Sequence, residues 1–345
     1  METNLEDEGR ITSDRAVSFG KPGPREGEKL RETSFTFVDA DGEKIFVYRW
    51  APADQQPKAV VQIAHGLLEA AARYRRGAAA LKTSGYLVYA NDHRGHGKTA
   101  RSLEELGDWG EDGFNASVRN LHLLAGIIRR ENPGLPLFLF GHSMGSFLVQ
   151  NYLTKYPVDL QGVILSGSND SPPGLALNLG IAVAKREVAK KGPRTRSPKL
   201  HKLVFGAYNK GFEPARTPFD WLSRDEAEVA KYINDPYCGG IASAGLYYDL
   251  FRGLKETYKK KNRQRIRRDL SVYIFSGSKD PVGMNGRGVR KLVRAYQKLG
   301  LEDVTYRLYK DGRHEMLNEL NRDEVTKDLL NWLDRQTAKA KKRLT

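Results

Sequence analysis

Ser143 lies at the centre of the sequence GHSMG, directly after the apolar run PLFLF and before a stretch with helical spacing. This order is typical of a strand, a sharp turn and a helix that together hold a serine in a strained conformation. Glycines are expected at Gly141 and Gly145, because side chains there would collide with the neighbouring helix and strand. The turn would project the Ser143 hydroxyl outward and leave the Met144 N–H at a helix N-terminus, facing a developing negative charge. The pattern predicts a nucleophilic serine.

A nucleophilic serine needs a base, and the base needs a carboxylate that orients it. His314 lies in KDGRHEML, after the last predicted strand and before the last predicted helix. Asp280 lies in SVYIFSGSKDPVG, after the preceding predicted strand. All three side chains would then meet at the same edge of a parallel sheet. We therefore predict a triad of Ser143, His314 and Asp280.

Each partner also has a structural interpretation. Asp280 precedes Pro281, so its role could be limited to initiating a turn. His314 could instead cap the last helix. Asp311 and Glu315 are rival acids, but they share a loop with His314 and would have difficulty reaching its Nδ1 atom.

A second histidine motif, RGHG, offers His96 as another candidate base. It follows a strand other than the one that should carry the base. The position favours a structural role for both His96 and Arg94.

An oxyanion would need a second backbone donor besides Met144, and this donor is expected after the strand AVVQIAHG. His65, Gly66 and Leu67 occupy that position. We assign the role to the Leu67 N–H and expect His65 to brace the loop.

The elements that must position these residues alternate along the chain. Residues 34–38 and 45–50 predict an antiparallel hairpin around the turn signal Asp41-Gly42. Continuously apolar strands are then separated by helices, predicted at 118–130, 144–155 and 288–299 and at the C-terminus. Such alternation predicts an α/β fold whose parallel sheet is covered on both faces. The alternation is interrupted once, by helical patterns with Pro and Gly punctuation.

This interruption defines the predicted domains. Residues 1–33 predict a flexible N-terminal tail, residues 34–168 the first part of the core, 169–268 a helical insertion, and 269–345 the second part of the core.

Composition limits the possible classes. The chain of 345 residues is 39% hydrophobic, which suffices for one large core. Its single cysteine, Cys238, allows no intrachain disulfide, and no Cys/His pattern predicts a zinc site. The N-terminus has no apolar signal region, and no run of about eighteen uncharged apolar residues follows. We expect a soluble, cytoplasmic protein without a metal.

The charge is strongly basic, with a net charge of +15 and a pI near 9.7. Residues 171–269 hold 21 Lys and Arg against 10 Asp and Glu. Because no nucleic-acid-binding module is recognisable, we expect no specific nucleic-acid partner. The surplus predicts either a solvated basic surface or attraction to anionic membranes or acidic substrates.

Six segments, taken in order, resemble the monoacylglycerol lipase and lysophospholipase branch of the α/β-hydrolases. They are HGLLEAAARY, ANDHRGHGKT, GHSMGS, LSGSND, SGSKDPVG and GRHEML. The resemblance implies an α/β-hydrolase fold with a mostly parallel sheet of about eight strands and an inserted helical cap. It also implies serine esterase chemistry without a cofactor, with Ser143, Asp280 and His314 as the triad and Leu67 and Met144 as the oxyanion hole.

The chain departs from this family after the His-Gly pair, where a small residue and then Glu-His are usual. Here the sequence is Leu68-Glu69-Ala70. The missing histidine and the bulkier Leu68 predict a differently supported oxyanion hole or a narrower acyl pocket. Catalysis is not excluded, because the expected donors are backbone groups.

The expected function is hydrolysis of monoacylglycerols or lysophospholipids through an acyl-enzyme. A peptidase, an acyltransferase and a non-catalytic ligand-binding protein are the alternatives. The segment GLALNLGIAVAK predicts either a helix that meets an anionic membrane, with Lys185, Arg186, Lys190 and Lys191 close behind, or a cap helix with a solvated basic end.

Overall fold

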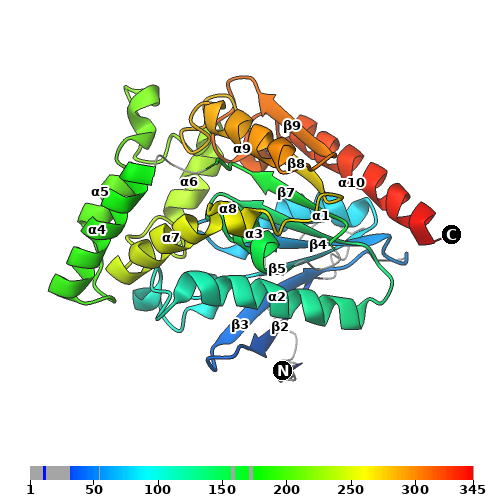
Figure 1. Ribbon diagram of the computed structural model, residues 1–345, viewed down its shortest axis with the longest axis horizontal. Coiled ribbons are helices and arrows are strands. Elements are labelled where there is room, and N and C mark those ends of the chain that lie inside the picture. The colour runs from blue at the N-terminus through cyan, green and yellow to red at the C-terminus, as the bar shows by residue number, and fades with distance from the viewer. Residues whose placement is uncertain (1–10, 13–31, 54, 157–159, 171–173, 345) are drawn as a thin grey trace.

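A central sheet organises the chain in the computed structural model, which describes residues 11–12, 32–53, 55–156, 160–170 and 174–344 (Figure 1). Its strands have the spatial order β1-β2-β3-β5-β4-β6-β7-β8-β9. They are β1 (Ile11–Thr12), β2 (Glu32–Val38), β3 (Lys44–Trp50), β4 (Ala59–Ala64), β5 (Tyr86–Asn91), β6 (Leu137–His142), β7 (Gly162–Ser166), β8 (Ser271–Gly277) and β9 (Val304–Tyr309). The six strands from β5 to β9 in this order pair in parallel, which confirms the mostly parallel sheet.

The N-terminal edge of the sheet is antiparallel. β2 and β3 form the predicted hairpin, and Gly42 takes a positive φ of 83° in its turn. Most of the predicted tail, residues 1–33, lies outside the described residues. Ile11 and Thr12 of that segment pair with β2 as a strand of two residues.

Strand residues alternate between two buried layers because successive side chains point to opposite faces. Leu137 and Leu139 of β6 pack with α2 (Gly113–Glu131), α3 (Met144–Lys155) and α9 (Arg287–Lys298). Phe138 and Phe140 of the same strand pack with α1 (Arg75–Thr83) and α10 (Arg322–Leu344). Both faces of the sheet are therefore covered, as the continuously apolar strands predict.

The interval between β7 and β8 is helical. It contains α4 (Gly174–Lys191), α5 (Pro198–Phe205), η4 (Tyr208–Phe212), α6 (Glu226–Asn234), α7 (Ala244–Thr257) and α8 (Lys260–Arg263). In Figure 1, α4 and α5 stand at one end of the sheet, whereas α7 contacts α2, α3 and α4. The last part of the interval thus joins the helical layer on the sheet.

Short 3-10 helices complete the described elements: η1 (Ala71–Tyr74), η2 (Gly97–Thr99), η3 (Leu103–Glu105) and η5 (Met316–Asn318). Within the described ranges, every helix is too short or too polar to cross a bilayer.

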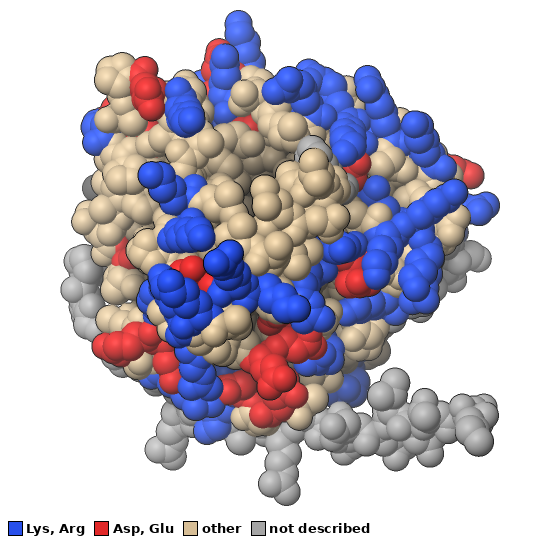
Figure 2. All heavy atoms as spheres, turned by 60° about the vertical axis from the view of Figure 1, so that its left-hand side comes forward, with Lys and Arg blue, Asp and Glu red and all other residues tan. Residues whose placement is uncertain are grey.

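The face that carries α4 and α5 has an uneven surface. Figure 2 shows a broad area of uncharged residues, hollowed near its centre and bordered by Lys and Arg side chains. Leu175 and Leu179 of α4 are 85% and 64% exposed, and Leu203 of α5 is 55% exposed.

Candidate active site

Ser143 occupies the turn between β6 and α3, with φ 50° and ψ −121°. This backbone conformation is strained for a residue with a side chain. A Cβ atom at Gly145 would lie 2.1 Å from the carbonyl oxygen of Ala64, and one at Gly141 would lie 2.6 Å from that of Gly145. Only glycine therefore allows α3 to approach β4 and β6 closely enough to form the predicted turn between strand and helix, called here the elbow.

His314 and Asp280 are joined directly. The distance between His314 Nδ1 and Asp280 Oδ1 is 3.0 Å. Asp280 is fully buried, and it also accepts hydrogen bonds from the Ser276 hydroxyl at 2.6 Å and the Val282 N–H at 2.9 Å. These bonds fix the carboxylate so that Nδ1 carries the proton and Nε2 is left as the basic nitrogen.

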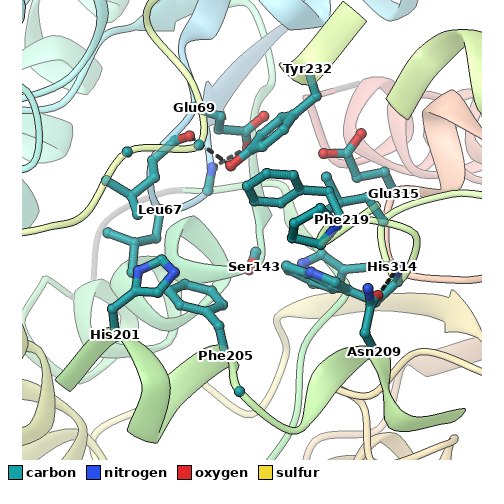
Figure 3. A pocket seen from close by; sticks show the side chains of 18 of the residues that line it. Leu67, Glu69, Ser143, His201, Phe205, Asn209, Phe219, Tyr232, His314 and Glu315 are labelled. Atoms are coloured by element: carbon teal, nitrogen blue, oxygen red, sulfur yellow. Dashed lines mark hydrogen bonds between the residues drawn. The ribbon is translucent and has the colours of Figure 1, made fainter. Parts of the chain in front are cut away.

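The His314 ring is held tightly beside the elbow. It lies 4.6 Å from the His142 ring and 5.0 Å from the Trp221 ring, measured between centroids. A Cβ atom at Gly167 would lie 2.7 Å from His314 Cε1. Ser143 and His314 line the same pocket, as Figure 3 shows.

Electrostatics around His314 favour its protonated form. Burial alone would lower the pKa of His314, but the charge of Asp280 and its hydrogen bond outweigh burial and raise this pKa above its ordinary value. Burial would raise the pKa of Asp280, yet His314 and the donors around the carboxylate lower it. Burial also lowers the pKa of the adjacent His142 to about 4. Among the described histidines, His314 is therefore the one whose imidazole is hydrogen-bonded to a carboxylate.

The residues predicted for the oxyanion hole come from two segments beside Ser143. Met144 is the first residue of α3, and Leu67 follows β4 and lines the pocket. A Cβ atom at Gly66 would lie 3.2 Å from Ser143 Cβ, so the loop after β4 lies against the elbow.

The departure at Leu68 has a structural role that the sequence did not reveal. Leu68 has a positive φ of 58°, a conformation that favours glycine. Its carbonyl accepts hydrogen bonds from the Tyr232 hydroxyl at 2.9 Å and from the Gly239 N–H at 3.1 Å. The loop that carries Leu67 is thus tied to α6 and to the segment that follows it.

A buried ion cluster, two of whose acids line the pocket, was also missed. Arg73 donates to Glu69 at 2.6 Å and to both oxygens of Glu315 at 2.6 and 2.7 Å. Glu69 also accepts from the Gly66 N–H at 2.5 Å and from the Tyr74 hydroxyl at 2.8 Å. Burial would raise the pKa of Glu315, but Arg73 lowers it to about 2. The cluster joins the loop after β4 to the loop of His314.

The rival acid Glu315 and the residues of the RGHG motif are occupied elsewhere, and Asp311 is exposed. Glu315 pairs with Arg73, whereas Asp280 contacts His314. His96 lies in a buried group with His65 and His93, whose ring centroids are 5.3 and 6.5 Å from that of His96. Arg94 pairs with Asp39 at 2.5 Å and with Asp41 at 2.6 Å. These contacts support the structural roles predicted for the RGHG motif.

The segment before α6 is fastened to the loop of His314. The backbone N–H groups of His314 and Glu315 donate to the carbonyls of Trp221 and Leu222, at 3.3 and 2.7 Å. Arg224 pairs with Glu319 at 2.9 Å.

The pocket has a volume of about 330 Å³ and largely apolar walls. The side chains that form these walls are Leu67, Leu68, Phe205, Pro218, Phe219, Trp221, Leu222 and Tyr232. The described residues contain no group of three His, Cys, Asp or Glu side chains suited to a metal ion. The arrangement can perform acyl transfer on a substrate with an apolar part.

Comparisons with known proteins identify the family. Residues 55–321 match the family model described as serine aminopeptidase, S33. The chain is 32% identical over 302 residues to a monoacylglycerol lipase of Mycolicibacterium smegmatis, covering 86% of this chain and 95% of the relative. It is 28% identical over 307 residues to a monoglyceride lipase of Rattus norvegicus, covering 88% and 91% of the two chains.

A solved structure gives the same result. A thermostable carboxyl esterase from Bacillus coagulans superimposes with a TM-score of 0.82 at 26% identity, over 90% of this chain and 100% of the esterase. With relatives of this kind along most of its length, the chain belongs to the serine aminopeptidase family of α/β-hydrolases, in its monoacylglycerol lipase-like branch, and is a carboxylic ester hydrolase.

Proposed function

We propose that the chain hydrolyses monoacylglycerols or lysophospholipids through a triad of Ser143, His314 and Asp280. The observation that carries this proposal is the 3.0 Å contact between His314 Nδ1 and Asp280 Oδ1, beside a serine on a strained turn in the same pocket. The monoacylglycerol lipases among the relatives support a small ester or lipid as the substrate.

In the proposed reaction, Ser143 attacks the ester carbonyl while His314 Nε2 takes its proton. The N–H groups of Leu67 and Met144 stabilise the tetrahedral oxyanion, and each such donor typically contributes about 3 to 4 kcal/mol. His314 then protonates the leaving alcohol, and water releases the acid from the acyl-enzyme. Asp280 holds the imidazole in the required tautomer and stabilises its charged form throughout.

The pocket favours an ester over a peptide. An aminopeptidase needs an anionic group for the α-ammonium of its substrate. The acids that line this pocket, Glu69 and Glu315, are both hydrogen-bonded to Arg73, so neither carboxylate is free to pair with such an ammonium. The family model named after an aminopeptidase nevertheless keeps peptidase activity as the second candidate, with acyltransfer beside it.

A substrate panel tests this choice. We expect turnover of monoacylglycerols, lysophospholipids and p-nitrophenyl esters and none of aminoacyl amides. A serine-reactive fluorophosphonate should label the folded protein at Ser143. Preferred cleavage of aminoacyl amides would make the protein a peptidase, and absence of labelling would favour a non-catalytic binder.

We propose that residues 169–268 act as a cap over the core formed by residues 34–168 and 269–345. Three elements of this interval, α5, η4 and α6, contribute residues to the pocket that holds Ser143. The cap would supply most of the apolar wall, and the core would supply the reacting groups. The cytoplasmic location expected from the sequence stays a prediction.

We also propose that α4 makes peripheral contact with anionic membranes. Leu175 and Leu179 lie one helical turn apart and are exposed, and Lys190 and Lys191 are exposed at the other end of α4. Lys191 already pairs with Glu187 at 2.8 Å, so Lys190 would contribute more.

Vesicle binding tests the membrane proposal. The protein should bind vesicles that contain phosphatidylglycerol more strongly than neutral vesicles, and the difference should shrink as salt shortens the Debye length toward about 8 Å. Lys190→Glu together with Lys191→Glu should weaken this binding without changing turnover of a short soluble ester. Equal binding to both kinds of vesicle would leave these lysines as solubilising charge.

A further inference from the structure

A second, apolar cleft lies between α4, α5 and α7. Its volume is about 630 Å³, within the roughly 300–1,000 Å³ typical of small-molecule sites. α5 lies between it and the pocket of Ser143: His201 and Phe205 line that pocket, Leu203 and Val204 line the cleft, and Lys202 borders both.

The cleft has a buried floor and an exposed apolar rim. Leu250 and Leu254 of α7 are 6% and 7% exposed and form the floor. Leu179 and Leu203 line the same cleft at 64% and 55% exposure. Leaving such apolar side chains in water is unfavourable, so an apolar ligand that covers them would be stabilised.

The charged side chains that line the cleft have one sign. They are Lys199 and Lys202, which lie three residues apart on α5 and therefore on the same face of the helix. Both are exposed, and no acidic side chain is among the described residues that line the cleft. This charge complements a ligand with an apolar chain and one anionic end.

We propose that this cleft binds a long-chain fatty acid, with its hydrocarbon chain between α4 and α7 and its carboxylate at Lys199 and Lys202. Two cations, with no acid among the described lining residues, favour a simple anion over a zwitterionic lysolipid, whose cationic group would meet the lysines. The site needs no catalysis, although a fatty acid is also the product that the proposed ester hydrolysis releases.

Paired variants on α4 test the position of the hydrocarbon chain of the fatty acid. Val183 lines the cleft, whereas its neighbour Ala182 is exposed and does not. Binding of oleate, titrated calorimetrically below its micelle concentration, should weaken at least tenfold in Val183→Trp and stay within twofold in Ala182→Trp. Leu203→Glu, at an exposed position, should also weaken binding and provides a second variant that does not depend on core packing.

Two charge-reversal variants test where the carboxylate of the fatty acid binds. Lys199→Glu should weaken oleate binding about five- to tenfold and reduce its dependence on salt, whereas Lys190→Glu, which makes the same charge change on α4, should stay within twofold. A neutral monoglyceride of the same chain length should not distinguish Lys199→Glu from the parent.

Binding in the pocket of Ser143 is the competing outcome. Loss of oleate binding in Phe219→Trp, with Val183→Trp and Lys199→Glu unaffected, would overturn the proposal, as would failure of the parent to bind oleate. Turnover of a short ester by Val183→Trp should remain near that of the parent. A protein that binds oleate in the cleft but hydrolyses no ester would refute the proposed function alone.

Discussion

Ser143 is the residue on which the proposed reaction depends. Ser143→Ala should abolish ester hydrolysis while the thermal unfolding midpoint stays close to that of the parent, because a half-buried hydroxyl is replaced by hydrogen. Turnover of a p-nitrophenyl ester and a circular dichroism melt measure the two effects. Residual activity within tenfold of the parent would exclude Ser143 as the nucleophile.

Replacement of Asp280 and replacement of Asp311 should have different effects on activity. Asp280→Asn should lower kcat by several orders of magnitude, about ten-thousandfold in the serine proteases, because the wrong imidazole tautomer is then held. Asp311→Asn serves as the matched control and should retain nearly full activity. If Asp311→Asn were the more damaging change, the acid of the triad would have to be reassigned.

The raised pKa of His314 sets the pH dependence of hydrolysis. Burial lowers this pKa and Asp280 more than restores it, so the midpoint at which the neutral base forms lies above the ordinary histidine value of 6.5. The acid limb of kcat/KM should therefore lie above pH 6.5, and activity should fall as pH decreases through it. In Asp280→Asn the residual activity should have its acid limb at lower pH, because burial then acts without the carboxylate. An acid limb of the parent well below pH 6.5 would contradict this account.

Sequence reasoning reached the residues whose positions follow from strand order and missed those that depend on distant contacts. Ser143, Asp280 and His314 each follow a recognisable apolar strand, so their meeting at one sheet edge could be predicted. Arg73 and Glu315 are 242 positions apart, and nothing local announces their ion pair. Glu69 and Arg73 are four positions apart, and this spacing was the one local signal that could have indicated part of the cluster.

The cluster of Glu69, Arg73 and Glu315 joins two loops, and its removal should be felt as loss of stability. Arg73→Met would leave two buried carboxylates without their cationic partner, which typically costs about 3 to 5 kcal/mol of the free energy of unfolding. Arg75→Met is the matched control on the surface, where the pair with Glu32 contributes about 0 to 1 kcal/mol. Urea unfolding compares the two variants, and equal losses would show that the buried cluster contributes no more than a surface pair.

At the level of elements, the alternation of strands and helices was sufficient to predict the parallel sheet. It was not sufficient to predict how the helices of the insertion are arranged. The predicted helices at 144–155 and 288–299 match α3 and α9 within a residue. The insertion lacks the strands that would fix the order of its helices in space. Tertiary contacts decide how α7 packs on α2 and α3. The positive φ of Leu68 could not be predicted either, because leucine rarely adopts this conformation.

The whole molecule should lose stability in mild acid. Burial lowers the pKa of His65 to about 4 and that of His96 to about 3, and it also lowers the pKa values of His93 and His142. Their unfolded forms bind protons near pH 6.5, so stability is fully present above this pH and is lost as pH falls toward the folded values. His314, Asp92 and Asp249, whose pKa values are raised, act in the opposite direction but are fewer than the four buried histidines. Urea midpoints at pH 7.5, 6.0 and 5.0 should decrease steadily, and a constant midpoint would contradict the prediction.

The backbone bonds from His314 and Glu315 to Trp221 and Leu222 divide the cap into two parts for directed evolution. One part can vary freely, and the other must keep its length because it holds the His314 loop. A library at His201 and Phe205 on α5 would vary the wall of the pocket and select for new substrates while the imidazole keeps its place. Insertions or deletions near Trp221 would shift the carbonyls that hold the His314 loop. Natural relatives with altered substrate ranges are therefore expected to differ in length within α5 and η4 rather than at the segment that follows them.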